Sequence, residues 1–253
     1  MLAAMLPFAI AAVAGIVAFA LYRGHSRRRE DRQLAQQLLS SLHQNYPPEA
    51  EFRLLAPDEL PTISIAPLEE AARAFAAAGF APLGDVANLA LVDADGAPIP
   101  MRVAVRAEEG LQACAYFHPA ADQLFYDVSS DLSDGRTLTS STALDSGKLE
   151  VPPEIERHYL PPGAPFDTVV RLQRDRLAEL RRVTPGLAAS AATTSELLLE
   201  DMRREARRKH AHRRELGWLT ETELQRFTPA GVPPERMSTI HAEIRRLVAA
   251  EAA

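Results

Sequence analysis

Residues 101–142 read MRVAVRAEEGLQACAYFHPAADQLFYDVSSDLSDGRTLTSST, and this stretch decides the fold. Apolar and polar side chains alternate along 101–106 and again along 124–129, which is the period of a half-buried β-strand. Turn-forming residues interrupt the stretch at regular intervals, for example at Gly110 and at Asp134-Gly135. Short alternating runs separated by such turns predict an antiparallel β-meander.

The meander extends toward the N-terminus, where a helix precedes it. Five predicted strands make up the sheet: 85–92, 101–107, 111–118, 123–130 and 136–142. Before them, Pro67 is suited to a first helical position and Gly79 to a helix end, with Leu68 and Phe75 on one apolar face between them. A sheet with one covered face needs a neighbouring element, so we expect this helix to pack on the meander. The predicted class is α+β, in a domain spanning 67–186.

Two short motifs in this domain resemble a pattern found in other proteins. The run AGFAPLGD occupies 78–85 and the run SDGRTLTSS occupies 133–141. Together they are similar to uncharacterised bacterial membrane-anchored proteins that carry a helix, a Leu-Gly-Asp turn, a meander and an Asp-Gly-x-x-Leu-Thr strand. The resemblance implies a fold of this kind behind a membrane span. It brings no activity, cofactor or catalytic residue with it.

The N-terminal stretch 1–22, MLAAMLPFAIAAVAGIVAFALY, contains no charged side chain. As a helix it would be roughly 33 Å long, enough to cross a hydrocarbon core of about 30 Å. We therefore predict a single-pass transmembrane anchor that binds the lipid bilayer. Two alternatives stay open: a signal peptide cleaved near Ala18-Phe19-Ala20, which would give a secreted or periplasmic product, and a buried helix of a soluble protein.

Basic residues set the predicted orientation of the anchor. Five arginines follow the apolar stretch: Arg23, Arg27, Arg28, Arg29 and Arg32. The positive-inside rule keeps such clusters in the cytoplasm, so the N-terminus is predicted outside and the bulk of the chain cytoplasmic, at a bacterial inner membrane. The single cysteine, Cys114, excludes an internal disulfide framework and fits a reducing compartment.

The segments on either side of the α+β domain are predicted to be mainly helical. Residues 23–45 form a basic juxtamembrane helix whose leucines either pack on its own domain or pair with another helix as a short coiled coil. Residues 46–66 read as a Pro-rich linker, and 187–253 as a helical C-terminal region. Within that region, Thr220 and Glu223 have the spacing of a capping box.

Charge is distributed unevenly along the chain of 253 residues. The middle, 49–154, carries 18 acidic and 6 basic residues, whereas both flanks are net basic. An acidic middle makes nucleic acid an unlikely partner for this part of the chain, because DNA and RNA binding depends on neutralising phosphates. The asymmetry predicts different neighbours for different surfaces.

Two short patterns resemble functional motifs but favour structural interpretations. Asp93-Ala-Asp95-Gly96 begins like a calcium loop, yet the bidentate glutamate is missing, so we predict a hairpin turn. Cys114 and His118 lie on one predicted strand, where four residues separate them by roughly 13 Å. We therefore predict a buried cysteine rather than a thiol–imidazole pair.

Motifs for metals and cofactors are missing from the sequence. His210 and His212 lie two residues apart on a predicted helix and point about 200° away from each other, so one ion cannot take both. The sequence contains no nucleophile elbow, phosphate-binding glycine loop or nucleotide fingerprint. We predict no cofactor and no metal.

A basic cluster on the predicted helix 203–214 stands out from this background. Its seven cations are Arg203, Arg204, Arg207, Arg208, Lys209, Arg213 and Arg214. They could form a solvated helix face, bind anionic lipid next to the anchor, or dock on an acidic surface within the chain or of another copy. Nucleic acid is disfavoured here as well, because aromatic residues that could stack on bases are missing nearby.

The leading function hypothesis is a non-catalytic interaction or scaffold module with a protein partner or a second copy of itself. The second is a membrane-tethered enzyme with a polar site on strands 123–142. That site would use five side chains: Asp127, Asp131, Thr137, Thr139 and Ser141. The third hypothesis is the sensing of anionic lipid by the basic cluster.

Overall fold

A computed structural model describes residues 28–92, 98–143, 149–227 and 233–251. The described part is an α+β structure with a mixed sheet, so the predicted class is confirmed at that level. The predicted anchor, residues 1–22, lies outside the described residues and stays a prediction. Among the helices that are described, none combines the length and the apolar character needed to cross a bilayer.

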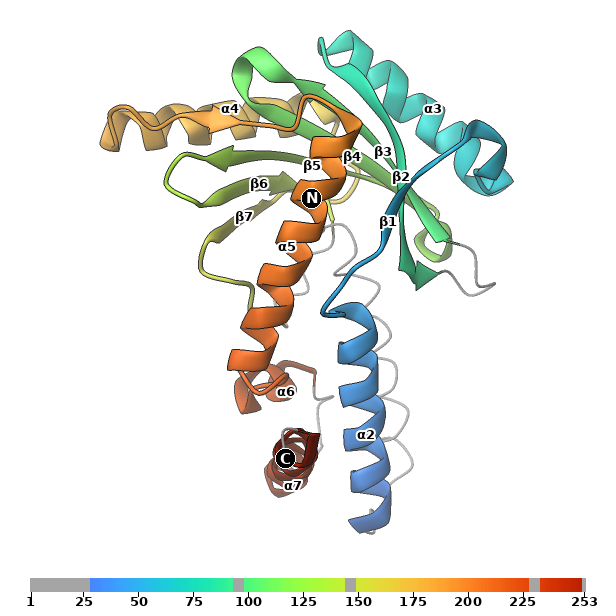
Figure 1. Cartoon of the computed structure of the whole chain (residues 1–253), viewed down its shortest axis with the longest axis vertical. Helices are drawn as coiled ribbons and strands as arrows, with labels where there is room; N and C mark the ends of the chain where they lie inside the picture. Colours follow the sequence, from blue (N-terminus) through green and yellow to red (C-terminus); the bar gives the residue numbers. More distant parts are fainter. Residues whose placement is uncertain (1–27, 93–97, 144–148, 228–232, 252–253) are drawn as a thin grey trace. The chain divides into compact units, whose positions relative to one another are not determined.

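The predicted meander forms the centre of the sheet (Figure 1). Its five strands follow one another in antiparallel pairs: β2 (Ala81–Val92), β3 (Pro98–Arg106), β4 (Leu111–His118), β5 (Gln123–Leu132) and β6 (Thr137–Ser141). Gly110 joins β3 to β4 at φ 68°, a left-handed conformation that glycine adopts without strain. A Cβ at this position would lie 2.4 Å from the Ala189 carbonyl oxygen.

Three short strands enlarge the sheet beyond the prediction of five antiparallel strands. β1 (Phe52–Leu55) pairs antiparallel with β2, β8 (Ala189–Ser190) pairs with β5, and β7 (Ile155–Tyr159) pairs with β6 in parallel. The sheet therefore has eight strands and is mixed. The prediction missed these strands because two to five residues beside prolines give little periodic signal.

Two helices cover one face of the sheet, which we call the helix-covered face. They are α3 (Thr62–Ala77) and α4 (Phe166–Val183), and their Phe75, Phe166 and Val170 share a buried cluster with strand residues such as Val128 and Leu138. The predicted packing of a helix on the meander is confirmed. Its predicted start at Pro67 is wrong, because α3 begins at Thr62 and keeps Pro67 inside. The predicted linker 46–66 accordingly contains β1, the 3₁₀ turn η2 (Pro57–Glu59) and the first turn of α3.

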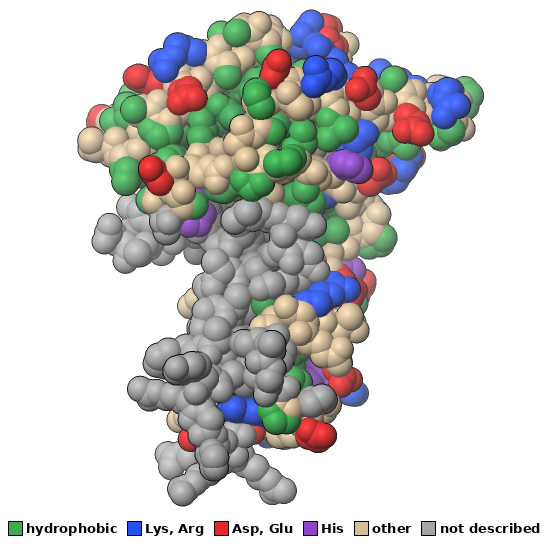
Figure 2. Space-filling view, turned by 180° about the vertical axis from the view of Figure 1, so that it is seen from behind, with side chains coloured by type: hydrophobic (Ala, Val, Ile, Leu, Met, Phe, Trp, Pro, Cys, Tyr) green, Lys and Arg blue, Asp and Glu red, His purple; other side chains and the backbone are tan. Residues whose placement is uncertain are grey.

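The described residues divide into two compact units. The first draws on 49–143 and 153–205 and holds the sheet with α3 and α4; the second draws on 28–48, 149–152, 206–227 and 233–251. On the face shown in Figure 2, acidic and basic side chains of the described residues are interspersed.

The second unit is helical. It contains α2 (Arg28–Asn45), α6 (Glu221–Phe227), α7 (Pro234–Glu251) and the second half of α5 (Ser195–Glu215). The leucines of α2 lie in a core with Trp218, Ile240 and Ile244, so α2 packs within its own unit. The predicted capping box at Thr220 and Glu223 is present: Glu223 N donates to Thr220 Oγ1 at 3.1 Å, and Thr220 N donates to Glu223 Oε2 at 2.8 Å.

Candidate functional site

Five polar side chains proposed from the sequence lie on the opposite side of the sheet, which we call the polar face. Strand side chains alternate between the two sides. Val128 and Leu138 point into the helix-covered core, so the odd-numbered residues of β5 and β6 point the other way. In register, Asp127 lies across from Ser141, Ser129 from Thr139, and Asp131 from Thr137. Four of the five proposed residues are buried: Asp127, Thr137, Thr139 and Ser141.

The carboxylates on the polar face bond to hydroxyl groups of the facing strand. Ser141 Oγ donates to Asp127 Oδ1 at 2.5 Å, and Thr137 Oγ1 donates to Asp131 Oδ1 at 2.8 Å. Ser141 Oγ also accepts a bond from the backbone N–H of Ala143 at 3.0 Å. Its hydroxyl is thus used both as a donor and as an acceptor, as in a cross-strand link.

Burial changes the acid–base properties of two neighbours on this face. Removal from water raises the pKa of Asp127, while the hydrogen bond from Ser141 acts in the opposite direction. Cys114 lies across from Asp127 on β4, and burial, followed by the Asp127 charge, raises the pKa of its thiol. A protonated, buried thiol is a poor nucleophile, which agrees with the structural interpretation of Cys114.

β7 adds an arginine to the polar face that the sequence analysis did not identify. Arg157 lies beside Thr139 in the parallel register, and its side chain is 4% exposed. The ion-pair partner is Glu205 on α5, whose Oε1 is 3.9 Å from Arg157 Nη2. That distance is too long for a hydrogen bond. Within the described part of the chain, none of the three guanidinium nitrogens has a hydrogen-bond acceptor.

The structure does not place the seven cations of the basic cluster on one surface. Lys209 and Arg213 are buried, and Arg213 Nη1 bonds to Glu223 at 2.7 Å. Four of the other cations are exposed, and Arg208 is half-buried. Of the exposed ones, Arg203 donates to the Phe52 carbonyl at 3.2 Å and Arg204 to Asp201 at 2.6 Å. The other two exposed cations are Arg207 and Arg214.

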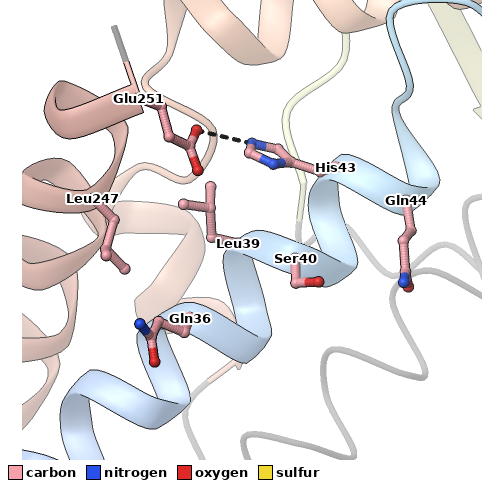
Figure 3. Close-up of a pocket in the computed structure, with 7 residues that line it drawn as sticks. All are labelled: Gln36, Leu39, Ser40, His43, Gln44, Leu247 and Glu251. Atoms are coloured by element: carbon pink, nitrogen blue, oxygen red, sulfur yellow. Dashed lines mark ion pairs between the residues drawn. The ribbon is translucent and has the colours of Figure 1, made fainter. Parts of the chain in front are cut away.

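A shallow groove lies between α2 and α7 of the second unit (Figure 3). Its wall includes His43, whose Nε2 is 3.8 Å from the Glu251 carboxylate and whose ring contacts Trp218 at 4.0 Å between centroids. Burial lowers the pKa of His43, whereas the Glu251 charge acts to raise it. Such an open groove with few converging polar groups offers little to hold a small molecule.

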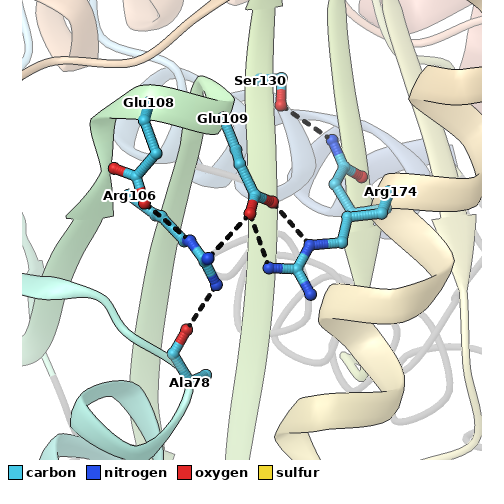
Figure 4. A network of polar contacts seen from close by, with 7 residues as sticks. Ala78, Arg106, Glu108, Glu109, Ser130 and Arg174 are labelled. Carbon is cyan, nitrogen blue, oxygen red and sulfur yellow. Dashed lines mark hydrogen bonds and ion pairs between the residues drawn. The ribbon is translucent and has the colours of Figure 1, made fainter.

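A polar network on the helix-covered side joins three elements (Figure 4). Arg174 of α4 makes two bonds to the Glu109 carboxylate, at 2.6 and 2.9 Å. Arg106 Nη2 lies 3.0 Å from Glu109, and its Nη1 donates to the carbonyl of Ala78 at 2.9 Å. These contacts fasten the end of α3 and the middle of α4 to the β3–β4 connection, which is a structural role.

The remaining candidates from the sequence are the two aspartates of the predicted 93–96 turn and the histidines of α5. Asp93 and Asp95 lie outside the described residues. His210 Nδ1 is 2.8 Å from the carbonyl oxygen of Tyr46, and its ring packs against Trp218. Among the residues whose positions are described, no three His, Cys, Asp or Glu side chains are grouped so as to hold an ion.

Comparison with protein-family models, with curated proteins and with solved structures gives no match to this chain. The case for a function therefore depends on the residues and contacts described above.

Proposed function

We propose that the protein is a single-pass membrane protein whose body is a non-catalytic interaction module on the cytoplasmic side. The anchor is the uncharged stretch 1–22, and its orientation follows from the arginines after it. The body would act by presenting a rigid sheet to a partner, either another protein or a second copy of the chain.

One observation favours an interaction module over an enzyme. The hydroxyl of Ser141 donates to Asp127 and accepts from Ala143, so its hydrogen-bonding capacity is used within the sheet. Asp127 is placed as a general base for Ser141 would be, but a catalytic nucleophile also needs an open approach to its oxygen, and Ser141 is fully buried. Thr137 is likewise bonded to Asp131. These contacts support a framework role for the polar side chains of strands 123–142.

Lipid sensing by the helix 203–214 has less support than partner binding. Lys209 and Arg213 are buried, and Arg203 and Arg204 already have acceptors within the chain. Each cation near an anionic membrane surface contributes about 1 kcal/mol. With Arg207 and Arg214 as the main exposed cations left, little attraction to lipid is expected.

The test is reversible cross-linking of the full-length, C-terminally tagged chain in its native membranes, followed by mass spectrometry. We expect one protein, or the untagged chain itself, to be recovered in constant ratio to the tagged chain. A control fusion that carries residues 1–45 and the tag should not recover it. Recovery of nothing beyond the control would contradict an interaction module, and protection of the tag from protease in inverted vesicles would contradict the orientation.

The same experiment distinguishes the interaction module from the alternative of a membrane-tethered enzyme. Ser141→Ala removes a hydroxyl of the catalytic site considered above, and we expect the folded variant to recover the partner as the wild type does. Loss of a cellular phenotype with partner recovery unchanged would instead favour an enzyme.

A further inference from the structure

β7 is the last strand of the sheet, and within the described part of the chain no further strand pairs with its outer edge (Figure 1). Thr137 N donates to Glu154 O at 2.8 Å, and Leu160 N donates to Ser141 O at 2.7 Å, which fixes the phase of the parallel ladder. In a parallel pair, alternate residues direct both backbone groups to the neighbouring strand. Glu156 and His158 therefore face β6, and Arg157 directs its N–H and C=O away from the sheet.

Exposure agrees with this geometry. Arg157 is partly exposed as a whole residue, although its side chain is only 4% exposed. The accessible surface of Arg157 therefore belongs largely to its backbone. An accessible backbone donor and acceptor at a sheet edge is a template for pairing with another strand.

Side chains cover part of the opposite edge of the sheet. At β1, Arg203 Nη2 of α5 donates to the outward carbonyl of Phe52 at 3.2 Å. Arg53 and Glu59 form an ion pair at 2.7 Å beside the strand, and the Glu59 carboxylate also accepts from Ala56 N at 2.8 Å. Side chains of this kind protect an edge from pairing.

The side chain of Arg157 points to the kind of partner that the edge fits. Its guanidinium is buried on the polar face, with Glu205 Oε1 at 3.9 Å and no acceptor within hydrogen-bond distance among the described residues. Buried polar groups in native proteins nearly always have partners, so a buried cation with unused donors needs an explanation. A carboxylate is the acceptor that matches the planar donor fork of arginine.

We propose that an extended peptide segment of a partner protein adds to the β7 edge and places an aspartate or glutamate opposite Arg157. The residue paired with Arg157 directs its side chain to the same face, and in an antiparallel pair the two Cβ atoms are about 4.5–5.5 Å apart. Backbone pairing provides the register, and the ion pair selects an acidic residue. This inference depends on the proposed function, because it names the partner chemistry of the interaction module.

A free small anion fits these observations less well than a peptide. Glu205 and Asp127 lie near the guanidinium, and the Arg157 charge acts on Asp127. Two carboxyl groups in the neighbourhood repel a diffusing anion, whereas a carboxylate carried on a paired strand is held in place by backbone hydrogen bonds. The edge and the guanidinium also belong to the same residue.

The test uses a random seven-residue peptide library displayed against the full-length chain in detergent micelles. We expect selected peptides to be rich in β-branched residues and to share one acidic position. Arg157→Gln should weaken binding of a selected peptide by at least about tenfold, as expected for the loss of a buried charge pair. The matched control is Arg182→Gln, which removes a 76% exposed arginine of α4 and should leave binding unchanged.

Changes on the peptide side keep the test independent of the folding of any variant. Replacing the shared acidic residue by its amide, or methylating the backbone nitrogens of that residue and the next, should each abolish binding to the wild-type chain. Absence of a shared acidic position, equal binding by Arg157→Gln, or binding that survives methylation would overturn the inference. If the cross-linked partner is recovered equally well by Arg157→Gln, the interaction module stands and this edge is not its site.

Discussion

Two buried arginine–glutamate pairs in this chain are built very differently. In the second unit, Arg213 and Glu223 have side chains 1% and 0% exposed and meet at 2.7 Å. Arg213 also donates to the carbonyls of Glu150 and Trp218, and Glu223 accepts from the backbone of Glu150 and Thr220. In the first unit, Arg157 and Glu205 are 4% and 8% exposed and stand 3.9 Å apart.

The difference separates a pair that can stabilise the fold from a pair whose arginine has unused donors. A buried ion pair stabilises a fold only when its geometry is good and the remaining donors and acceptors are used. The pair of Arg213 and Glu223 meets that condition and joins α5, α6 and the 149–152 segment. The Arg157 guanidinium does not meet that condition, which agrees with the binding role proposed for it.

Loss of the pair of Arg213 and Glu223 is expected to have the largest effect on the stability of the fold. Arg213→Met leaves the Glu223 charge buried without its partner, so we expect the free energy of unfolding to fall by about 3–5 kcal/mol. The fluorescence of Trp218, the single tryptophan, reports on this unit in urea titrations. The control Arg214→Met changes an exposed neighbour and should stay within about 0.5 kcal/mol of the wild type. Equal effects of the two replacements would remove the distinction.

Loss of a buried hydrogen-bonded contact between uncharged groups should lower the stability by an intermediate amount. Gln173 of α4 is fully buried; it accepts from Ser140 Oγ at 2.8 Å and donates to the Leu138 carbonyl at 3.0 Å. Gln173→Leu removes both of these buried hydrogen bonds, which should cost about 1–3 kcal/mol. Thermal unfolding followed by circular dichroism measures it, with the exposed Asp175→Ala as the control. An unchanged midpoint would mean that the contact does not form.

The polar face should show a smaller, pH-dependent effect. Burial raises the pKa of Asp127 above its ordinary value of 3.8, so protonation favours the folded state. The wild type therefore loses stability as the pH rises from 3.8 through the raised pKa, whereas Asp127→Asn does not titrate. The stability difference in favour of the variant should grow by about 1.4 kcal/mol for each unit of pKa elevation. A pH-independent difference would show that Asp127 is not buried as described.

Much of the fold could be predicted because its signals are local. The meander follows from alternation and from turns such as Asp134-Gly135, and the capping box at Thr220 and Glu223 fixes a helix start from residues three apart. β7 could not be predicted, because its five residues lie between prolines and pair in parallel with β6 through the tertiary fold. With β7 missed, Arg157 was missed as well.

The basic cluster shows the limit of reading charge from sequence. Seven cations within twelve positions suggest a solvated face, yet the burial of Arg213 depends on Glu223, ten residues away on the next helix. The spacing of residues in the sequence does not predict such a contact. Burial alternates along Ile155–Tyr159, but Arg157 occupies the central inward position. The sequence therefore does not alternate between apolar and polar residues, and it gives no strand signal there.

The most direct test of the central claim, that Arg157 is kept for binding rather than for stability, is the unfolding free energy of Arg157→Met/Glu205→Leu. Replacing an ion pair of poor geometry by apolar side chains is generally neutral or stabilising, by up to about 4 kcal/mol. We predict that the double variant unfolds at the same or a higher urea concentration than the wild type. A loss of stability comparable to that of Arg213→Met would contradict the account.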